Sequence, residues 1–144
     1  PWMISEILVH PATAWSANAS HNARAAGRAI DNRAETAWAS GAAQSPGMWF
    51  QLDLGRAEMV SGLTLSAPAN ENPAGFRITT WNASANRWQV VCERTNNAAP
   101  VDVSFTATQT QFINIQLTRA SKLQWAIQHA HVAREMEAWL GPGN

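Results

Sequence analysis

The 144-residue sequence predicts an all-β fold, a sandwich built from about eight antiparallel strands. Short runs of alternating or continuous apolar residues recur along the chain, and clusters of Gly, Pro, Asn and Ser separate them. Sandwiches show this combination because their strands are short and each connection needs turn residues. The composition is that of a folded domain, since 46% of the residues are hydrophobic and eight are Trp.

Eight segments carry the strand pattern, at residues 4–9, 49–54, 60–66, 76–81, 88–92, 101–105, 111–117 and 126–133. In the segment at 111–117, Ile113, Ile115 and Leu117 share one face, and the residues between them share the other. The same reasoning assigns further residues to the core, namely Trp49, Leu52, Leu54, Leu63, Leu65 and Ile78. Turn chemistry at 45–47, 67–75 and 82–86 separates the strands.

Two segments favour helix instead of strand. Residues 22–30 are rich in Ala and can form a helical turn, although Gly27 interrupts them. Residues 134–140 also favour helix, so the last element is either a strand throughout or a strand followed by a short C-terminal helix. The chain length suits one domain, which we place at 1–140, with a linker or tail at 141–144, within a longer parent protein.

Charge and cysteine content exclude several classes of protein. Ten basic residues balance ten acidic ones without a basic cluster, so we expect no nucleic-acid partner. No stretch approaches the roughly 20 apolar residues that span a bilayer, and the start of the sequence lacks a basic and apolar leader. The single cysteine, Cys92, excludes an internal disulfide and lies in an apolar stretch, so we interpret it as a small core residue.

Two neighbouring motifs resemble those of a known family. Residues 29–38 read AIDNRAETAW and residues 46–55 read PGMWFQLDLG. They resemble the A-[IL]-D-G-x-x-x-T-x-W and P-G-x-W-[FLI]-x-[VIL]-D-L-G motifs of the discoidin, or coagulation factor 5/8 type C, family. Further agreement follows in order at 75–78 (GFRI), Trp88, 111–115 (QFINI) and 125–127 (WAI), so the resemblance covers roughly residues 15–132.

The resemblance implies a jelly-roll sandwich of the galactose-binding type, similar to family 32 carbohydrate-binding modules, with binding loops gathered at one end. It also implies an extracellular or cell-surface protein. The loops at 18–27, 39–47 and 67–74 would then meet the ligand, with the stretch at 121–125 close by. The candidate ligand-binding residues in them are His21, Asn22, Arg24, Ser40, Gln44, Asn70, Glu71, Asn72 and Trp125. Their amides, guanidinium and indole suit the hydroxyls and the C–H face of a sugar.

The sequence departs from two classes of relative. Galactose-binding relatives often place a His directly after T-x-W and an Arg at the end of the next long strand, where this chain has Ala39 and Ala67. A plain galactose site is therefore not expected. Membrane-binding relatives project apolar side chains from the same loops, whereas these loops are small and polar, so we expect no membrane insertion.

The calcium site of the family is expected to be degraded, and no metal or cofactor is predicted. The family's side-chain ligands correspond to Asp31, Thr36 and a carboxylate in the last strand, but the last position holds His129, and Arg33 replaces a loop Asp or Asn. We expect Arg33 or His129 to be the positive partner of Asp31. His129 and His131 would share a strand face, but without a third zinc ligand a structural role is favoured.

No nucleophile motif, phosphate loop or convincing carboxylate pair is present, so the sequence does not predict an enzyme. The expected function is that of a non-catalytic carbohydrate-binding module, which targets a larger parent protein to glycans. The alternative is a protein–protein interaction or structural accessory domain whose loops pack on a neighbouring domain.

Overall fold

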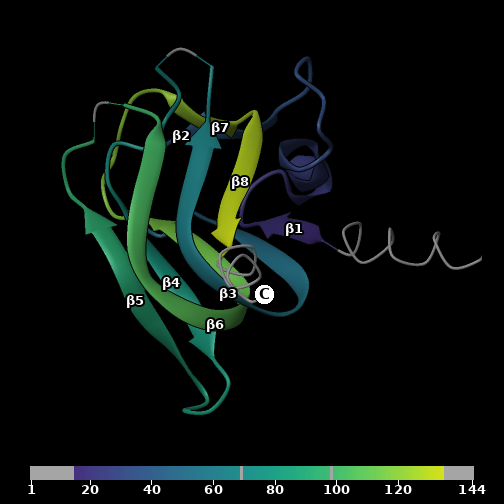
Figure 1. Cartoon of the computed structure of the whole chain (residues 1–144). Helices are drawn as coiled ribbons and strands as arrows, with labels where there is room; N and C mark the ends of the chain where they lie inside the picture. The colour runs from purple at the N-terminus through teal and green to yellow at the C-terminus, as the bar shows by residue number, and fades with distance from the viewer. Residues whose placement is uncertain (1–14, 69, 98, 135–144) are drawn as a thin grey trace, which may run out of the picture.

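Eight strands and one short helix make up the computed structural model, which describes residues 15–68, 70–97 and 99–134. The elements in chain order are β1 (Ser16–Ala19), the 3-10 helix η2 (Ala23–Ala29), β2 (Trp38–Ala43), β3 (Trp49–Ser66), β4 (Phe76–Asn82), β5 (Arg87–Arg94), β6 (Val101–Leu117), β7 (Gln124–Ile127) and β8 (His129–Arg134) (Figure 1). All strand pairs are antiparallel. The predicted all-β sandwich is therefore confirmed.

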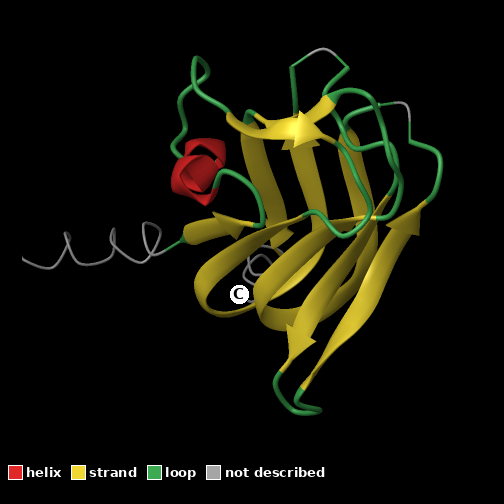
Figure 2. Cartoon of the chain, turned by 180° about the vertical axis from the view of Figure 1, so that it is seen from behind, coloured by secondary structure: helices red, strands yellow, loops and turns green. Residues whose placement is uncertain are grey.

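The two long strands, β3 and β6, organise the sheets. The larger sheet has the order β1-β3-β6-β4-β5, and β8 pairs with the second half of β3, while β2 and β7 form a separate two-stranded sheet. The register between β3 and β6 shifts between Asp53 and Glu58 and again between Val60 and Gly62. Such bulges bend a strand, and Figure 2 shows both strands curving from one layer of the sandwich into the other.

The core lies on the inner faces of these strands. Phe50, Leu52 and Leu54 alternate along β3 and are each at most 1% exposed. The predicted core is confirmed for Leu52, Leu54, Leu63, Leu65, Ile78, Ile113, Ile115 and Leu117. Trp49 is the exception, because it is out of phase with the inward residues of β3 and lies half-buried on the outer face. Cys92 is a free, buried thiol, as predicted.

The observed strands differ from the predicted ones in where they begin and end. The segments at 49–54 and 60–66 are one strand, β3, and those at 101–105 and 111–117 are one strand, β6. The segment at 126–133 is instead divided between β7 and β8, and the turn predicted at 22–30 is η2. Sequence reasoning missed β1 and β2, whose residues are mostly small or polar. The expectations for 4–9, for the residues after Arg134 and for 141–144 fall outside the described residues.

A substitution at Gly62 tests the packing of β3 between its two neighbours. A Cβ at this position would lie 2.8 Å from the carbonyl oxygen of Val103 on β6 and 3.4 Å from Cβ of Ala133 on β8. Gly62→Ala should therefore lower the free energy of unfolding by about 1–3 kcal/mol, measured by urea denaturation. Gly27→Ala is the matched control, because a Cβ there meets nothing within 4 Å. Equal stabilities of the two variants would contradict this packing.

Candidate functional site

A buried glutamine, Gln44, joins three loops at one end of the sandwich, the end at which β3 finishes at the top of Figure 1. Its Nε2 donates to the carbonyl oxygen of Asn72 at 3.0 Å, and its Oε1 accepts from the backbone N–H of Ala74 at 3.0 Å. Its own backbone pairs with Leu123 and Ser121 in the third loop. We call the joined segments 41–48, 67–68, 70–75 and 118–124 the loop end. Gln44 is only 2% exposed, so the prediction that it meets a ligand is wrong.

Trp125 and Ser40 are also structural residues, which corrects two further predictions. Trp125 is fully buried and lies 5.0 Å from the ring centroid of Trp38 and 6.4 Å from that of Phe50. It belongs to β7, where strand alternation turns it inward, and not to the exposed loop that the sequence suggested. The hydroxyl of Ser40 accepts from the backbone N–H of Trp125 at 3.2 Å and donates to the carbonyl oxygen of Ala42.

The polar residues that remain accessible at the loop end centre on Glu71 and Gln124. The Gln124 Nε2 donates to the Glu71 Oε1 at 3.4 Å, and the Gln124 Oε1 accepts from the backbone N–H of Gly41 at 3.2 Å. Asn70 and Asn72 flank Glu71, and Asn70 is exposed with a φ of 64°. The structure thus brings together the predicted Asn70, Glu71 and Asn72, and it adds Gln124 to them.

Sequence reasoning missed Gln124, although a signal was present. Gln124 directly precedes the core residue Trp125, and neighbouring residues in a strand point to opposite faces. Assigning Trp125 to the core would therefore have predicted that Gln124 faces outward.

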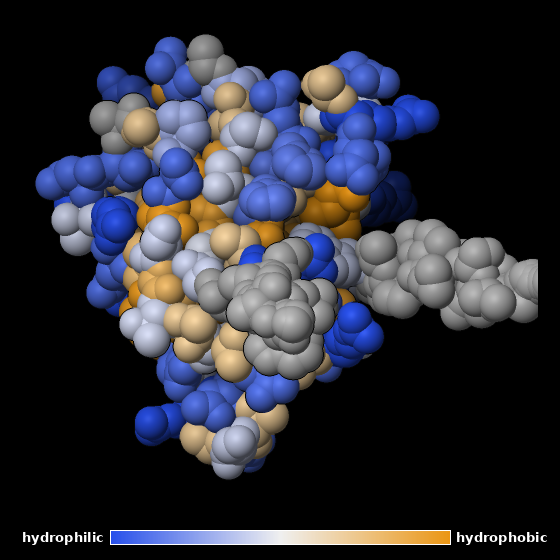
Figure 3. Space-filling model, in the orientation of Figure 1, coloured by the Kyte–Doolittle hydropathy of each residue, from blue (hydrophilic) through white to orange (hydrophobic). Residues whose placement is uncertain are grey.

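The surface around the loop end is polar. Figure 3 shows that hydrophilic residues predominate there on the visible face, while hydrophobic residues form a band across the middle of the molecule.

The other predicted residues, His21, Asn22 and Arg24, lie beside the start of β2. The Asn22 Nδ2 donates to the carbonyl oxygen of Ala39 at 2.8 Å, and the His21 carbonyl accepts from the indole N–H of Trp38 at 3.1 Å. Arg24 is exposed on η2 and forms no ion pair with the described residues. No hydrogen bond between described side chains joins this group to Asn70, Glu71 or Asn72.

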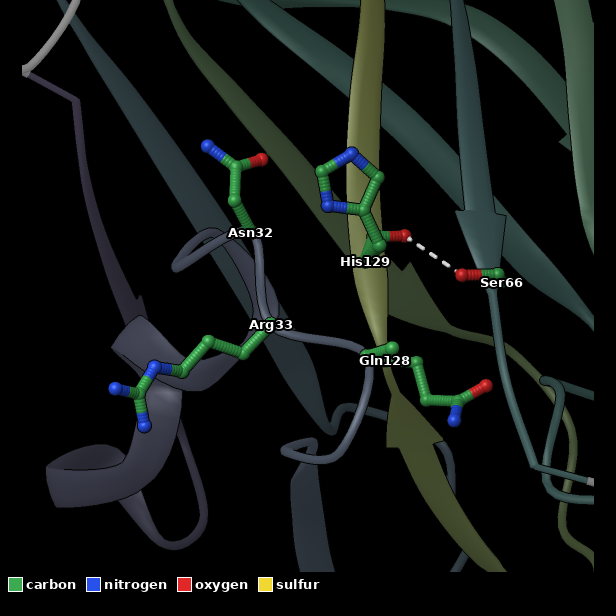
Figure 4. Close-up of a pocket in the computed structure, with 6 residues that line it drawn as sticks. Asn32, Arg33, Ser66, Gln128 and His129 are labelled. Carbon is green, nitrogen blue, oxygen red and sulfur yellow. Dashed lines mark hydrogen bonds between the residues drawn. The ribbon is translucent and has the colours of Figure 1, made fainter.

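A pocket of about 370 Å³ lies where the loop at 30–36, the end of β3 and the start of β8 meet (Figure 4). Its lining residues are Asn32, Arg33, Ala34, Ser66, Gln128 and His129. The Ser66 hydroxyl donates to the carbonyl oxygen of His129, and the Arg33 guanidinium points away from His129 and Gln128. The sequence had singled out Arg33 and His129 here, and it gave no signal for the other four residues.

The residues in this region do not fit calcium. Both carboxylate oxygens of Asp31 accept from the Thr36 hydroxyl, at 2.9 and 2.7 Å. The two side chains that would supply oxygen ligands are therefore hydrogen-bonded to each other. His129 offers nitrogen where a hard cation needs oxygen. Among the described residues, no group of three or more His, Cys, Asp or Glu side chains is placed to hold a metal. His129 and His131 are both exposed on one face of β8, as predicted.

Hydrogen bonds stabilise Asp31 as a carboxylate. The hydrogen bond from Thr36 is the main cause that lowers the pKa of Asp31, and the backbone N–H and charge of Arg33 add to it. No ion pair joins Asp31 to Arg33 or His129 among the described residues, so the predicted direct pairing is not observed. Arg33 acts only through its backbone N–H and its charge at a distance.

Comparisons with known proteins agree with this architecture, an antiparallel jelly-roll sandwich with loops joined at one end. The model of the F5/8 type C domain matches residues 11–133. The chain therefore belongs to the F5/8 type C domain family. Among curated proteins, no sequence matches the chain. Within the described residues, no helix combines the length and apolar character that crossing a bilayer requires.

Several solved structures share the fold. A variant of chitosan-binding module 1, derived from a chitosanase/glucanase of Paenibacillus sp. IK-5, has 25% identity and a TM-score of 0.73, covering 85% of this chain and 96% of that chain. Chitosan-binding module 2 of the same enzyme, in complex with chitotriose, has 23% identity and a TM-score of 0.72, covering 86% and 99%. The family 32 module of C. perfringens NanJ, in complex with galactose, has 21% identity and a TM-score of 0.69, covering 85% and 95%.

Thermal unfolding tests the misfit to calcium. After treatment with EDTA, adding millimolar Ca²⁺ should leave the Tm unchanged, because stabilisation by a ligand requires a site that binds it in the folded state. Mg²⁺ at the same concentration controls for ionic strength. A Tm rise of several degrees with Ca²⁺ alone would show that Asp31 and Thr36 reorganise to bind it.

The bond between Thr36 and Asp31 should make stability depend on pH. A lowered folded-state pKa contributes stability above the unfolded-chain value of about 3.9, and this contribution is lost as pH falls through the folded-state pKa. Thr36→Val should therefore be less stable than the wild type at pH 7, with the difference shrinking in acid, measured by urea denaturation. Thr106→Val, at an exposed position of β6, should show no such trend. A difference independent of pH would contradict the role of the carboxylate.

Proposed function

We propose that this chain is a non-catalytic carbohydrate-binding module, which binds glycan at the loop end and targets a larger parent protein to it. The observation that carries the proposal is the Glu71 and Gln124 pair, held at the surface by loops that the buried Gln44 joins. The similarity in fold to modules described as chitosan-binding, or solved in complex with galactose, supports it. In this proposal the parent protein supplies any catalysis and lies outside the cell or on its surface.

The loop end has the chemistry that a sugar requires. Carboxylate and amide groups at Glu71 and Gln124 accept from and donate to hydroxyls, and the amides of Asn70 and Asn72 extend the same surface. The side chain of Leu123 is 47% exposed and offers apolar contact to the C–H face of a ring. Because hydrogen bonds already restrain these loops, binding orders few additional groups, which favours affinity.

The charge of Glu71 indicates the kind of sugar. Its side-chain partner among the described residues is Gln124, an uncharged amide, and no described cation forms an ion pair with the Glu71 carboxylate. An ammonium group on a glucosamine unit would form a charge-assisted hydrogen bond with it. Ala39 and Ala67 stand where galactose-binding relatives often have His and Arg. We therefore infer that an amino-sugar oligomer is a better ligand than galactose.

Calorimetric titration with the glucosamine trimer chitotriose tests this function. Glu71→Gln should weaken binding about tenfold, because it removes the charge and keeps the shape of the side chain. Gln124→Ala should also weaken binding, since it removes an amide donor and acceptor. Glu93→Gln is the matched control, because it makes the same chemical change at an exposed carboxylate that pairs with Arg77 on another surface.

Each variant should unfold within a few degrees of the wild type, which separates lost binding from lost structure. Equal affinities for Glu71→Gln and Glu93→Gln would contradict the loop end as the binding site. An absence of binding to chitotriose and galactose at about 10 mM would favour the alternative, a protein-interaction or structural accessory domain.

A further inference from the structure

A second cavity lies far from the loop end, beside the turn that joins β4 to β5 at the bottom of Figure 1. Its volume is about 430 Å³, within the range of about 300–1,000 Å³ that small-molecule sites occupy. We call it the hairpin cavity; the side chains that line it include Trp81, Asn82, Ser84, Gln109, Gln111 and Phe112. We propose that the hairpin cavity is a second binding site, for one residue of a neutral sugar chain, which goes beyond the function proposed for the loop end.

The cavity follows from the bends in the two long strands. Ala57 lines it and lies within the first interruption of the register between β3 and β6, and Thr108, which also lines it, pairs with Val60 next to the second interruption. Bulged residues leave the regular ladder and open space beside it. Bulges are also common next to functional sites, where they change the direction of side chains. The hollow therefore has a structural cause in the backbone and does not depend on the position of one flexible side chain.

Hydrogen bonds hold the walls of the cavity in place. The hydroxyl of Thr110 accepts from the backbone N–H of Trp81 at 3.0 Å and donates to its carbonyl oxygen at 2.9 Å, which joins the end of β4 to β6. The Asn82 Nδ2 donates to Gln89, and the Gln89 Nε2 donates in turn to the Thr108 hydroxyl. A ligand would therefore meet a surface that is already ordered, which lowers the entropic cost of binding.

Two aromatic side chains contribute apolar surface to the cavity. Trp81 is partly exposed and packs edge-on against Trp88, with ring centroids 5.5 Å apart, so its ring is restrained. Phe112 is also partly exposed and lines the cavity from β6. Aromatic rings offer the broad apolar faces on which the C–H side of a sugar ring can pack.

The polar groups define the class of ligand. All the residues that line the cavity are uncharged, so it offers no partner for a charged ligand. The Gln111 Nε2 donates to Asp53, whereas the Gln111 Oε1 and the side chains of Ser84 and Gln109 form no hydrogen bond with the described residues. A purely apolar ligand would strip water from these groups without replacement, which costs free energy. A neutral molecule that combines hydroxyls with an apolar face satisfies both sets of groups.

Nuclear magnetic resonance of the whole chain can test the site with three neutral probes, namely cellotriose, maltotriose and triacetylchitotriose. At least one should shift the indole N–H signal of Trp81 saturably, with a Kd in the millimolar range, about 1–10 mM. The double variant Gln109→Ala and Gln111→Ala should weaken this binding at least about fivefold. Trp81→Ala should abolish it, and the glutamine variant keeps the test valid if the tryptophan variant fails to fold.

The loop-end variant Gln124→Ala separates the two sites, because it should leave the Trp81 response unchanged. A response that disappears in Gln124→Ala would assign the sugar to the loop end and overturn the proposal. The proposal would also fail if no probe shifts the Trp81 signal at about 10 mM, or if the double glutamine variant binds as well as the wild type. The function proposed for the loop end is tested separately, by the affinity of Glu71→Gln for chitotriose, so the two proposals can fail independently.

Discussion

The bends in β3 and β6 are the constraint on which the rest of the structure depends. Each strand is long enough to belong to both layers, so the pairing of one half fixes the position of the other. Gly55, with a φ of 81°, lies within the first interruption of the register, where a left-handed backbone is needed and a side chain would strain it. The bends therefore position the core and the hairpin cavity through one backbone feature.

Two different kinds of interaction then make the loop end rigid. The aromatic cluster of Trp38, Phe50 and Trp125 excludes water beneath the loops, and Trp38 and Trp125 approach edge to face. Above it, Gln44 supplies the hydrogen bonds that loop backbones would otherwise seek from water. Apolar packing alone would not fix the separation of the loops, because it lacks the directionality of these bonds.

Sequence reasoning was successful where the physical rule is local. Alternation along a strand is set by adjacent residues, so Leu52, Ile113 and most of the core could be predicted from spacing. The role of Gln44 could not, because the atoms that it bonds belong to backbone about 30 residues away and their identity leaves no trace in the sequence. Trp125 was placed at the surface because an indole suits a sugar, although the same large apolar surface equally favours burial.

At the loop end, the residues that restrain the loops are distinct from those that face outward. Gln44 bonds to main-chain atoms of Asn72 and Ala74, and main-chain atoms are the same whatever side chains the loop carries. Outward-facing positions such as the exposed Asn70 are thus free to vary in chemistry while the backbone beneath them stays in place. This division gives the domain a way to acquire new ligands by surface substitution at little cost to folding, since surface changes generally alter stability by no more than about 0.5 kcal/mol.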